Sequence, residues 1–126
     1  MGPHTVPVTE RDTGTVGSSG ATAFAKPDDE ARTSVVLPVY NEAGNIGPLL
    51  SELHAVIESE SMARYRPVEI LAIDDGSTDG SRELLREHAE ESPYLRAVFL
   101  RRNFGQSAAL AAGIDRATGE YVVTMD

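Results

Sequence analysis

The stretch Ser34-Val35-Val36-Leu37-Pro38-Val39, followed by Tyr40-Asn41-Glu42, decides the fold class of this chain. Its first six residues form a short apolar run rich in β-branched side chains, and turn chemistry begins at Asn41. A strand that is apolar along its whole length is typical of a parallel sheet covered on both faces. The stretch therefore predicts a buried strand with polar residues at its carboxyl end.

The same alternation of strand and helix continues along the chain. Asn45 is the predicted N-cap of the first helix, and Pro48 is tolerable in its first turn. One helix face is predicted to carry Ile46, Leu49, Leu50, Leu53, Val56 and Ile57. Further strands are expected at 68–73, 97–100 and 121–125, and further helices at 81–91 and 107–117. This order predicts an α/β fold, a Rossmann-like parallel sheet with helices on both faces.

Residues 1–33 have a different composition from the rest of the chain. They are rich in Thr, Gly, Ser and Pro, and their apolar residues show no period. Such a segment buries too little surface to offset its ordering entropy, so we expect a disordered tail over 1–33 and a domain over 34–126. We also expect the last strand of the domain to lie at an exposed sheet edge.

Composition excludes several classes of protein. The 126 residues carry 20 acidic and 11 basic side chains, a net charge of −9, which argues against a nucleic-acid-binding protein. The absence of cysteine excludes disulfides and cysteine-based zinc sites. No apolar run is long enough for a membrane helix, and the N-terminus has no signal-peptide core, so we expect a cytoplasmic protein.

Polar side chains follow the predicted strands where a parallel sheet places its ligands, at the carboxyl edge. Tyr40 supplies an aromatic face on which a nucleobase can stack. The carboxylates of Asp74 and Asp75 can accept hydrogen bonds from a base or from ribose hydroxyls. These residues predict a nucleotide site.

Charged residues at the same edge predict a diphosphate and a metal ion. Arg101 and Arg102 can form charge-assisted bonds to phosphate. Asp126 offers the hard oxygen ligands that suit Mg²⁺ or Mn²⁺. Because a chain of net charge −9 repels a diphosphate, we expect a divalent cation to bridge the two.

Each of these residues also has a simpler interpretation. The acidic residues from Asp74 to Asp79 are typical of turns and helix caps, and Tyr40 can be an ordinary half-buried aromatic residue. Arg101 and Arg102 can be solvated loop charges, and Asp126 can belong to a frayed terminus. The placement of such residues after each strand favours a ligand site. A dinucleotide-dependent oxidoreductase is disfavoured, because no Gly-X-Gly-X-X-Gly follows the first strand.

Four segments together resemble the family 2 glycosyltransferases. They read VLPVYNE at 36–42, IDDGSTDG at 73–80, RNFGQSAALAAG at 102–113 and GEYVVTMD at 119–126. The Asn103-Phe104-Gly105-Gln106 block resembles a narrower group, the polyprenyl-phosphate glycosyltransferases, which includes dolichyl-phosphate mannose synthase.

The resemblance implies a GT-A fold, a UDP- or GDP-sugar donor, Mg²⁺ or Mn²⁺, and inverting transfer to a polyprenyl phosphate at the cytoplasmic face of a membrane. The donor-binding residues that it implies are Pro38, Tyr40, Glu42, Asp74, Asp75 and Gln106. Asp126 matches the first aspartate of the family's Asp-X-Asp metal motif, and no catalytic residue is assigned.

The resemblance covers only part of a family 2 domain. The second aspartate of the metal motif and the acceptor region would follow Asp126, as would any membrane-associated segment. We therefore expect the donor-binding half of a transferase, inactive by itself. The alternative is a catalytically inert nucleotide-binding or interaction module.

Overall fold

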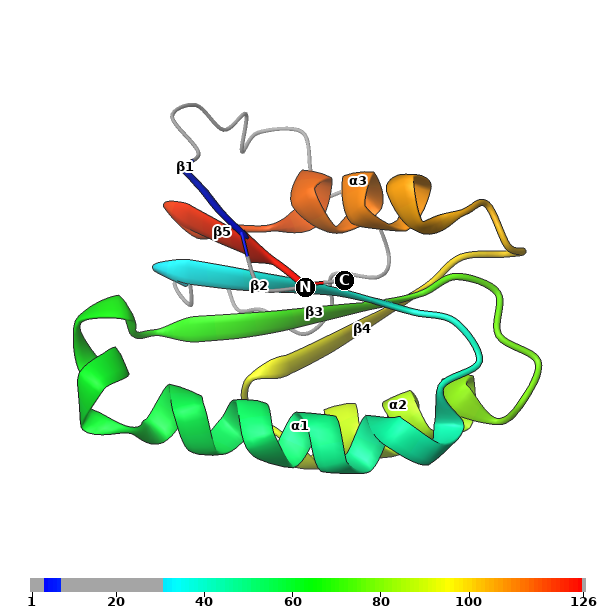
Figure 1. Cartoon of the computed structure of the whole chain (residues 1–126), viewed down its shortest axis with the longest axis horizontal. Coiled ribbons are helices and arrows are strands. Elements are labelled where there is room, and N and C mark those ends of the chain that lie inside the picture. Colours follow the sequence, from blue (N-terminus) through cyan, green and yellow to red (C-terminus); the bar gives the residue numbers. More distant parts are fainter. Residues whose placement is uncertain (1–3, 8–30, 126) are drawn as a thin grey trace.

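A five-stranded sheet with helices on both faces forms the centre of the molecule (Figure 1). The computed structural model describes residues 4–7 and 31–125. The strand order in the sheet is β1-β5-β2-β3-β4. Along the chain the elements are β1 (His4–Pro7), β2 (Thr33–Val39), α1 (Ala43–Glu58), the 3-10 helix η3 (Glu60–Tyr65), β3 (Val68–Asp74), α2 (Ser81–Glu91), β4 (Leu95–Phe99), α3 (Gln106–Arg116) and β5 (Tyr121–Thr124).

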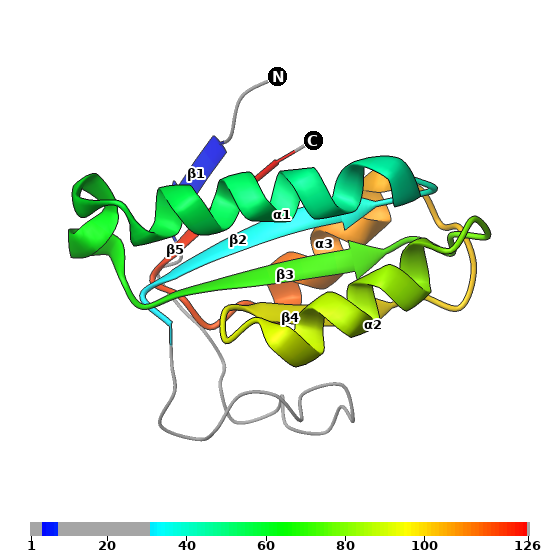
Figure 2. The ribbon, with the colours of Figure 1, turned by 90° about the horizontal axis from the view of Figure 1, so that it is seen from below.

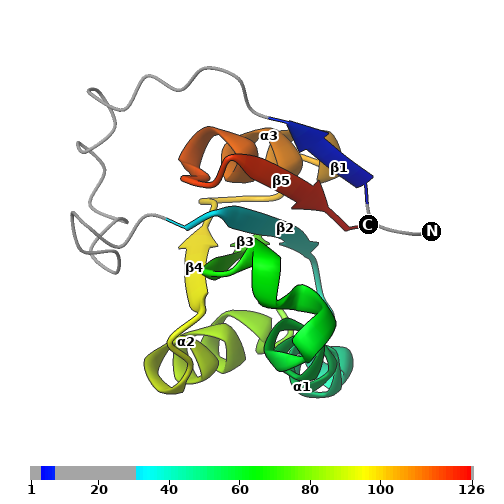
Figure 3. The same ribbon diagram turned by 90° about the vertical axis from the view of Figure 1, so that its left-hand side faces the viewer.

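The four strands from β2 to β5 are parallel, which confirms the predicted fold class. Helices α1 and α2 lie side by side on one face of the sheet (Figure 2), and α3 covers the other face (Figure 3). None of the helices in the described ranges is both long enough and apolar enough to span a membrane.

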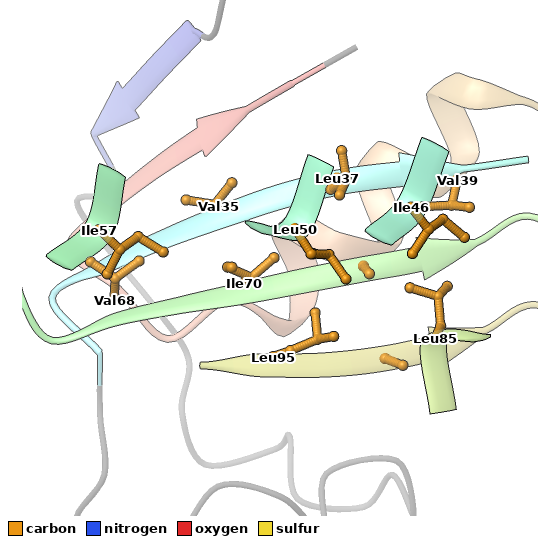
Figure 4. Packing of buried hydrophobic residues seen from close by; sticks show 12 residues of the cluster. Val35, Leu37, Val39, Ile46, Leu50, Ile57, Val68, Ile70, Leu85 and Leu95 are labelled. Atoms are coloured by element: carbon orange, nitrogen blue, oxygen red, sulfur yellow. The ribbon is translucent and has the colours of Figure 1, made fainter. Parts of the chain in front are cut away.

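Two apolar cores result from the alternation of side chains along β2 and β3. One core joins the sheet to α1 and α2 and contains Val35, Leu37, Val39, Ile46, Leu50, Ile57, Val68, Ile70, Ala72, Leu85, Leu95 and Ala97 (Figure 4). The other lies beneath α3 and contains Val36, Leu71, Ile73, Val98, Ala109, Ala117 and Val122. Because β2 and β3 contribute to both cores, their sequences are apolar at most positions.

The order in which successive strands are added to the sheet reverses after β4. The strands β2, β3 and β4 are added in order, and α3 then crosses back so that β5 pairs with the other side of β2. Helix α3 packs so closely that a Cβ at Gly113 would collide with the side chain of Val36. In open α/β sheets, such a reversal marks the edge where ligands bind.

The prediction of a disordered tail over residues 1–33 is wrong near both ends of that segment. Residues 4–7 form β1, which pairs antiparallel with β5 from His4 opposite Thr124 to Pro7 opposite Tyr121. Thr33, predicted as the last tail residue, is the first residue of β2. Backbone pairing needs no apolar pattern, and proline is tolerated in an edge strand. The rest of the predicted tail, residues 1–3 and 8–30, lies outside the described residues. The prediction that the last strand lies at an exposed edge is also wrong, because β5 pairs with both β1 and β2.

Helix α1 begins earlier than predicted. Its N-cap is Glu42, not Asn45, and the Asn45 amide donates to Glu42 Oε1 at 2.8 Å. The predicted buried residue Val56 is 53% exposed. The bounds predicted for α2 are confirmed, and the strand and helix bounds elsewhere shift by one or two residues.

Candidate functional site

A cavity of about 580 Å³ lies at the carboxyl ends of β2 and β3. Its lining residues are Leu37, Pro38, Val39, Tyr40, Glu42, Asn45, Ile46, Leu49, Leu50, Asp75, Leu85, Asn103, Gly105 and Gln106. Five of the six residues predicted to bind a donor therefore lie together: Pro38, Tyr40, Glu42, Asp75 and Gln106. They come from β2, from α3 and from loops at the right-hand side of Figure 1.

The β2–α1 loop (residues 40–42) is tied to the β3–α2 loop (residues 75–80) by hydrogen bonds. The backbone N–H of Asn41 donates to Ser77 Oγ at 2.9 Å, and that of Thr78 donates to Asn41 Oδ1 at 2.8 Å. Asn41 has a φ of 51°, a left-handed conformation that asparagine tolerates better than most residues. The backbone N–H of Glu42 donates to Ser81 Oγ at 3.0 Å. These bonds fix Tyr40 and Glu42 at the rim of the cavity.

Asp79 fixes the start of α1 relative to α2. Its carboxylate accepts from the hydroxyl of Ser81 at 2.6 Å, from the backbone N–H of Ser81 at 3.0 Å and from the backbone N–H of Ala43 at 3.1 Å. The Ser81 hydroxyl is the main group that lowers the pKa of Asp79 below 3.8. Since the native pKa is the lower one, the stabilisation from Asp79 is complete above pH 3.8 and is lost as the pH falls through the native pKa.

Asp74 lies behind the cavity and not in its lining. Its side chain is fully buried, and Oδ2 accepts from the backbone N–H groups of Gly76 at 3.1 Å and Ser77 at 3.0 Å. The same oxygen pairs with the guanidinium of Arg82 at 3.1 Å, and Arg82 also donates to the carbonyl of Leu100 at 3.0 Å. Of the two aspartates predicted to contact a base, the structure brings only Asp75 to the cavity.

Asp75 joins the cavity to the β4–α3 loop (residues 100–105). The residue is only 3% exposed. Its Oδ1 accepts from the backbone N–H of Phe104 at 2.8 Å, and its Oδ2 accepts from the backbone N–H of Gly105 at 3.0 Å and from the amide of Asn103 at 3.1 Å. Asn103 is a lining residue that the sequence interpretation did not assign to the site, although it begins the Asn-Phe-Gly-Gln block.

The lining suits a ligand that has an aromatic ring for stacking and several hydrogen-bond donors. Tyr40, 47% exposed, offers an aromatic surface at the rim. The charged lining residues, Glu42 and Asp75, are both acidic. Such a surface accepts hydrogen bonds from base N–H groups and from ribose hydroxyls, whereas it repels phosphate.

The residues predicted to bind phosphate and metal lie outside the lining or outside the described residues. Arg101 and Arg102 are exposed and do not line the cavity, and the guanidinium of Arg102 lies 4.5 Å from the ring centroid of Phe104. Asp126 lies outside the described residues. Within residues 4–7 and 31–125, no group of three His, Asp or Glu side chains is placed to hold a metal ion.

Comparison with protein families and curated proteins identifies similar sequences. The family model for glycosyl transferase family 2 matches residues 34–126. Undecaprenyl-phosphate 4-deoxy-4-formamido-L-arabinose transferase from Aeromonas hydrophila is 46% identical over 94 residues, covering 74% of this chain and 28% of the relative. Dodecaprenyl-phosphate galacturonate synthase from Rhizobium johnstonii is 41% identical over 101 residues, covering 79% of this chain and 29% of the relative. The chain thus spans less than a third of the length of these relatives.

Two solved structures have a fold similar to that of this chain. A mannosyltransferase from Pyrobaculum calidifontis, solved with GDP-Man and Mn²⁺, superposes with a TM-score of 0.62 at 30% identity over 78% of this chain and 28% of that chain. TarS residues 1–349 from S. aureus, solved with UDP, gives a TM-score of 0.63 at 25% identity over 75% of this chain and 27% of that chain. These similarities confirm the expected partial GT-A fold.

Proposed function

Because the chain belongs to glycosyl transferase family 2, we propose that it binds the sugar donor of a transferase whose acceptor is a polyprenyl phosphate. The observation that carries this proposal is the cavity at the carboxyl edge of the sheet, where five residues that the family motifs implicate lie together. The names of the two curated relatives, an undecaprenyl-phosphate transferase and a dodecaprenyl-phosphate synthase, support a polyprenyl phosphate as acceptor.

In this proposal the cavity receives the nucleoside of a UDP- or GDP-sugar. The ring of Tyr40 stacks on the base, and the acidic groups of Glu42 and Asp75 accept hydrogen bonds from the base or the ribose. Pro38 forms an apolar wall near the end of β2, and Gln106 approaches the donor from the start of α3. The repulsion between acidic lining residues and phosphate orients the diphosphate away from the cavity.

The proposed reaction is an inverting displacement at the anomeric carbon. A phosphate oxygen of the lipid forms a bond to that carbon as the bond to the nucleoside diphosphate breaks, and the diphosphate leaves with the electron pair. The lipid phosphate is already ionised near neutral pH, so it needs less help from a general base than a sugar hydroxyl does. This chain's residues contribute by binding and orienting the nucleoside.

We propose that a divalent cation, Mg²⁺ or Mn²⁺, accompanies the donor. When bound, such an ion stabilises the charge that develops on the leaving diphosphate. Asp126 is the residue of this chain proposed to hold it. The Mn²⁺ in the mannosyltransferase structure supports a divalent ion in this family, and we propose that acceptor binding and membrane association use segments outside the matched part of the relatives.

The proposal predicts that nucleoside diphosphates stabilise the 126-residue chain. Thermal unfolding followed with UDP or GDP, each with Mn²⁺, should show a midpoint that rises with ligand concentration, because a ligand that binds only the folded state stabilises it. Mn²⁺ alone is the control. The absence of any shift at millimolar UDP and at millimolar GDP would contradict the proposal.

We further expect the chain alone to show no turnover. The match spans 28% and 29% of the two curated relatives, and the described residues supply a donor cavity without an assigned acceptor site. Incubation with labelled UDP- or GDP-sugars, Mn²⁺ and a polyprenyl phosphate should yield no labelled lipid. Labelled lipid above the level of a heat-denatured control would show that the acceptor site is already present.

A further inference from the structure

We propose that Asn103 is a positioning residue for donor binding: with Asp75 it forms a latch that holds the β4–α3 loop against the cavity. This inference rests on the proposed function, since the ligand that it positions is the nucleoside. The latch is defined here as the contacts that join Asp75 to Asn103, Phe104 and Gly105. Asn103 acts through Asp75, and no contact of Asn103 with the reacting atoms is required.

The latch consists of four hydrogen bonds over three consecutive residues. The amide nitrogen of Asn103 donates both to the backbone carbonyl of Asp75 and to its Oδ2, each at 3.1 Å. The backbone N–H groups of Phe104 and Gly105 donate to the two carboxylate oxygens of Asp75 at 2.8 and 3.0 Å. The carboxylate of a single residue therefore fixes the direction in which the loop enters α3.

Backbone contact between the two loops supports the latch independently. Gly76 follows Asp75 and has a φ of 79°, a conformation that favours glycine. A Cβ built on Gly76 would lie 2.5 Å from the carbonyl carbon of Arg102 and 2.5 Å from the nitrogen of Asn103. The loop backbones touch beside the hydrogen bonds, so the position of the β4–α3 loop is fixed both by contact and by charge.

The latch also determines what Asp75 can offer a ligand. A carboxylate has about four acceptor positions, and side-chain and backbone groups of the β4–α3 loop already occupy three of them. One position, on Oδ1, is left for a donor group in the cavity. Loss of the Asn103 amide would free a position on Oδ2 and release the loop, so that Asp75 would face the cavity without a fixed orientation.

Hydrogen exchange and nucleotide titration of the 126-residue chain test this proposal together. In the ligand-free chain, Asn103→Ala should speed exchange of the Phe104 and Gly105 amides by about tenfold, the scale of one lost hydrogen bond to a charged group. Asn103→Asp should have a larger effect, because two carboxylates would then face each other. Calorimetric titration with UDP and with GDP, each with Mg²⁺, should show affinities that fall in the same order.

Tyr94→Phe is the matched control. It removes one side-chain hydrogen bond, from Tyr94 to Glu58 Oε2 at 2.9 Å, on the residue that precedes β4 at the other end of that strand. We expect wild-type exchange at Phe104 and Gly105 and wild-type nucleotide affinity in this variant.

The outcomes separate the latch from the proposed function. If the wild-type chain binds neither nucleotide, the proposed function fails and the positioning role fails with it. If the wild-type chain binds but Asn103→Ala leaves exchange or affinity unchanged, only the latch is overturned. The latch is supported if Asn103→Ala speeds exchange and weakens binding. It is supported further if Asn103→Ala and Asp75→Asn together weaken binding by less than the sum of their separate effects.

Discussion

Replacing Glu69 with alanine should lower the free energy of unfolding by about 3–5 kcal/mol, the cost of removing one partner of a buried ion pair. Glu69 Oε1 pairs with the guanidinium of Arg96 at 2.8 Å, and both residues are buried. Its Oε2 accepts from the hydroxyl of Ser34 at 2.6 Å and from the backbone N–H of Thr118 at 2.8 Å. The substitution would leave the buried guanidinium of Arg96, the buried hydroxyl of Ser34, and the part-buried N–H and hydroxyl of Thr118 without their acceptor.

Urea unfolding followed by circular dichroism measures this loss. Glu120→Ala is the control, because the pair between Arg32 and Glu120 is 3.7 Å long and exposed, and such pairs contribute at most about 1 kcal/mol. Glu69→Gln keeps an acceptor oxygen, so its loss in free energy of unfolding should lie between those of Glu69→Ala and Glu120→Ala. This variant tests the prediction even if Glu69→Ala does not fold. A loss in Glu69→Gln no larger than that in Glu120→Ala would contradict this account of the buried pair.

Replacing Tyr40 with alanine should weaken nucleotide binding by about 1–3 kcal/mol, roughly 5- to 150-fold, the range measured when a stacking aromatic residue is truncated. Tyr40 is 47% exposed at the rim of the cavity, so its removal should change the free energy of unfolding by only about 0.5 kcal/mol. Tyr40→Phe keeps the ring and should keep most of the affinity.

Calorimetric titration with UDP and with GDP, each with Mg²⁺, provides this comparison. Tyr65→Ala is the matched control, because Tyr65 is also partly exposed, at 36%, but lies in η3 and outside the cavity lining. Equal affinities for the wild-type chain and for Tyr40→Ala would remove Tyr40 from the site.

The fold was predictable because the deciding information is local. Residues 34–39 and 68–73 are apolar at almost every position, and this pattern indicates strands that are buried on both faces. The rule that ligands bind at the carboxyl edge of such a sheet then placed Tyr40 and Asp75 together, as the cavity confirms.

The features that the sequence did not predict depend on contacts between distant segments. Helix α1 begins at Ala43, whose backbone N–H donates to Asp79 in the β3–α2 loop. The sequence around Asn45 gives no sign of this contact with a distant residue. Strand β1 forms by backbone pairing with β5, which leaves no apolar period in the sequence. Asp74 and Asp75 are adjacent and both buried, and their contacts with distant segments separate their roles. Asp74 pairs with Arg82, whereas Asp75 lines the cavity and accepts hydrogen bonds from the β4–α3 loop.

We propose above all that the cavity at the carboxyl ends of β2 and β3 binds the nucleoside of a nucleoside diphosphate. Backbone amide chemical shifts of the 126-residue chain, recorded during titration with UDP and with GDP in the presence of Mg²⁺, test it most directly. The account predicts saturable shifts at Tyr40, Asp75, Asn103 and Gln106, with the amides around Glu69 and Tyr94 unchanged. Saturable shifts confined to residues outside the cavity lining, or no shifts with either nucleotide, would contradict it.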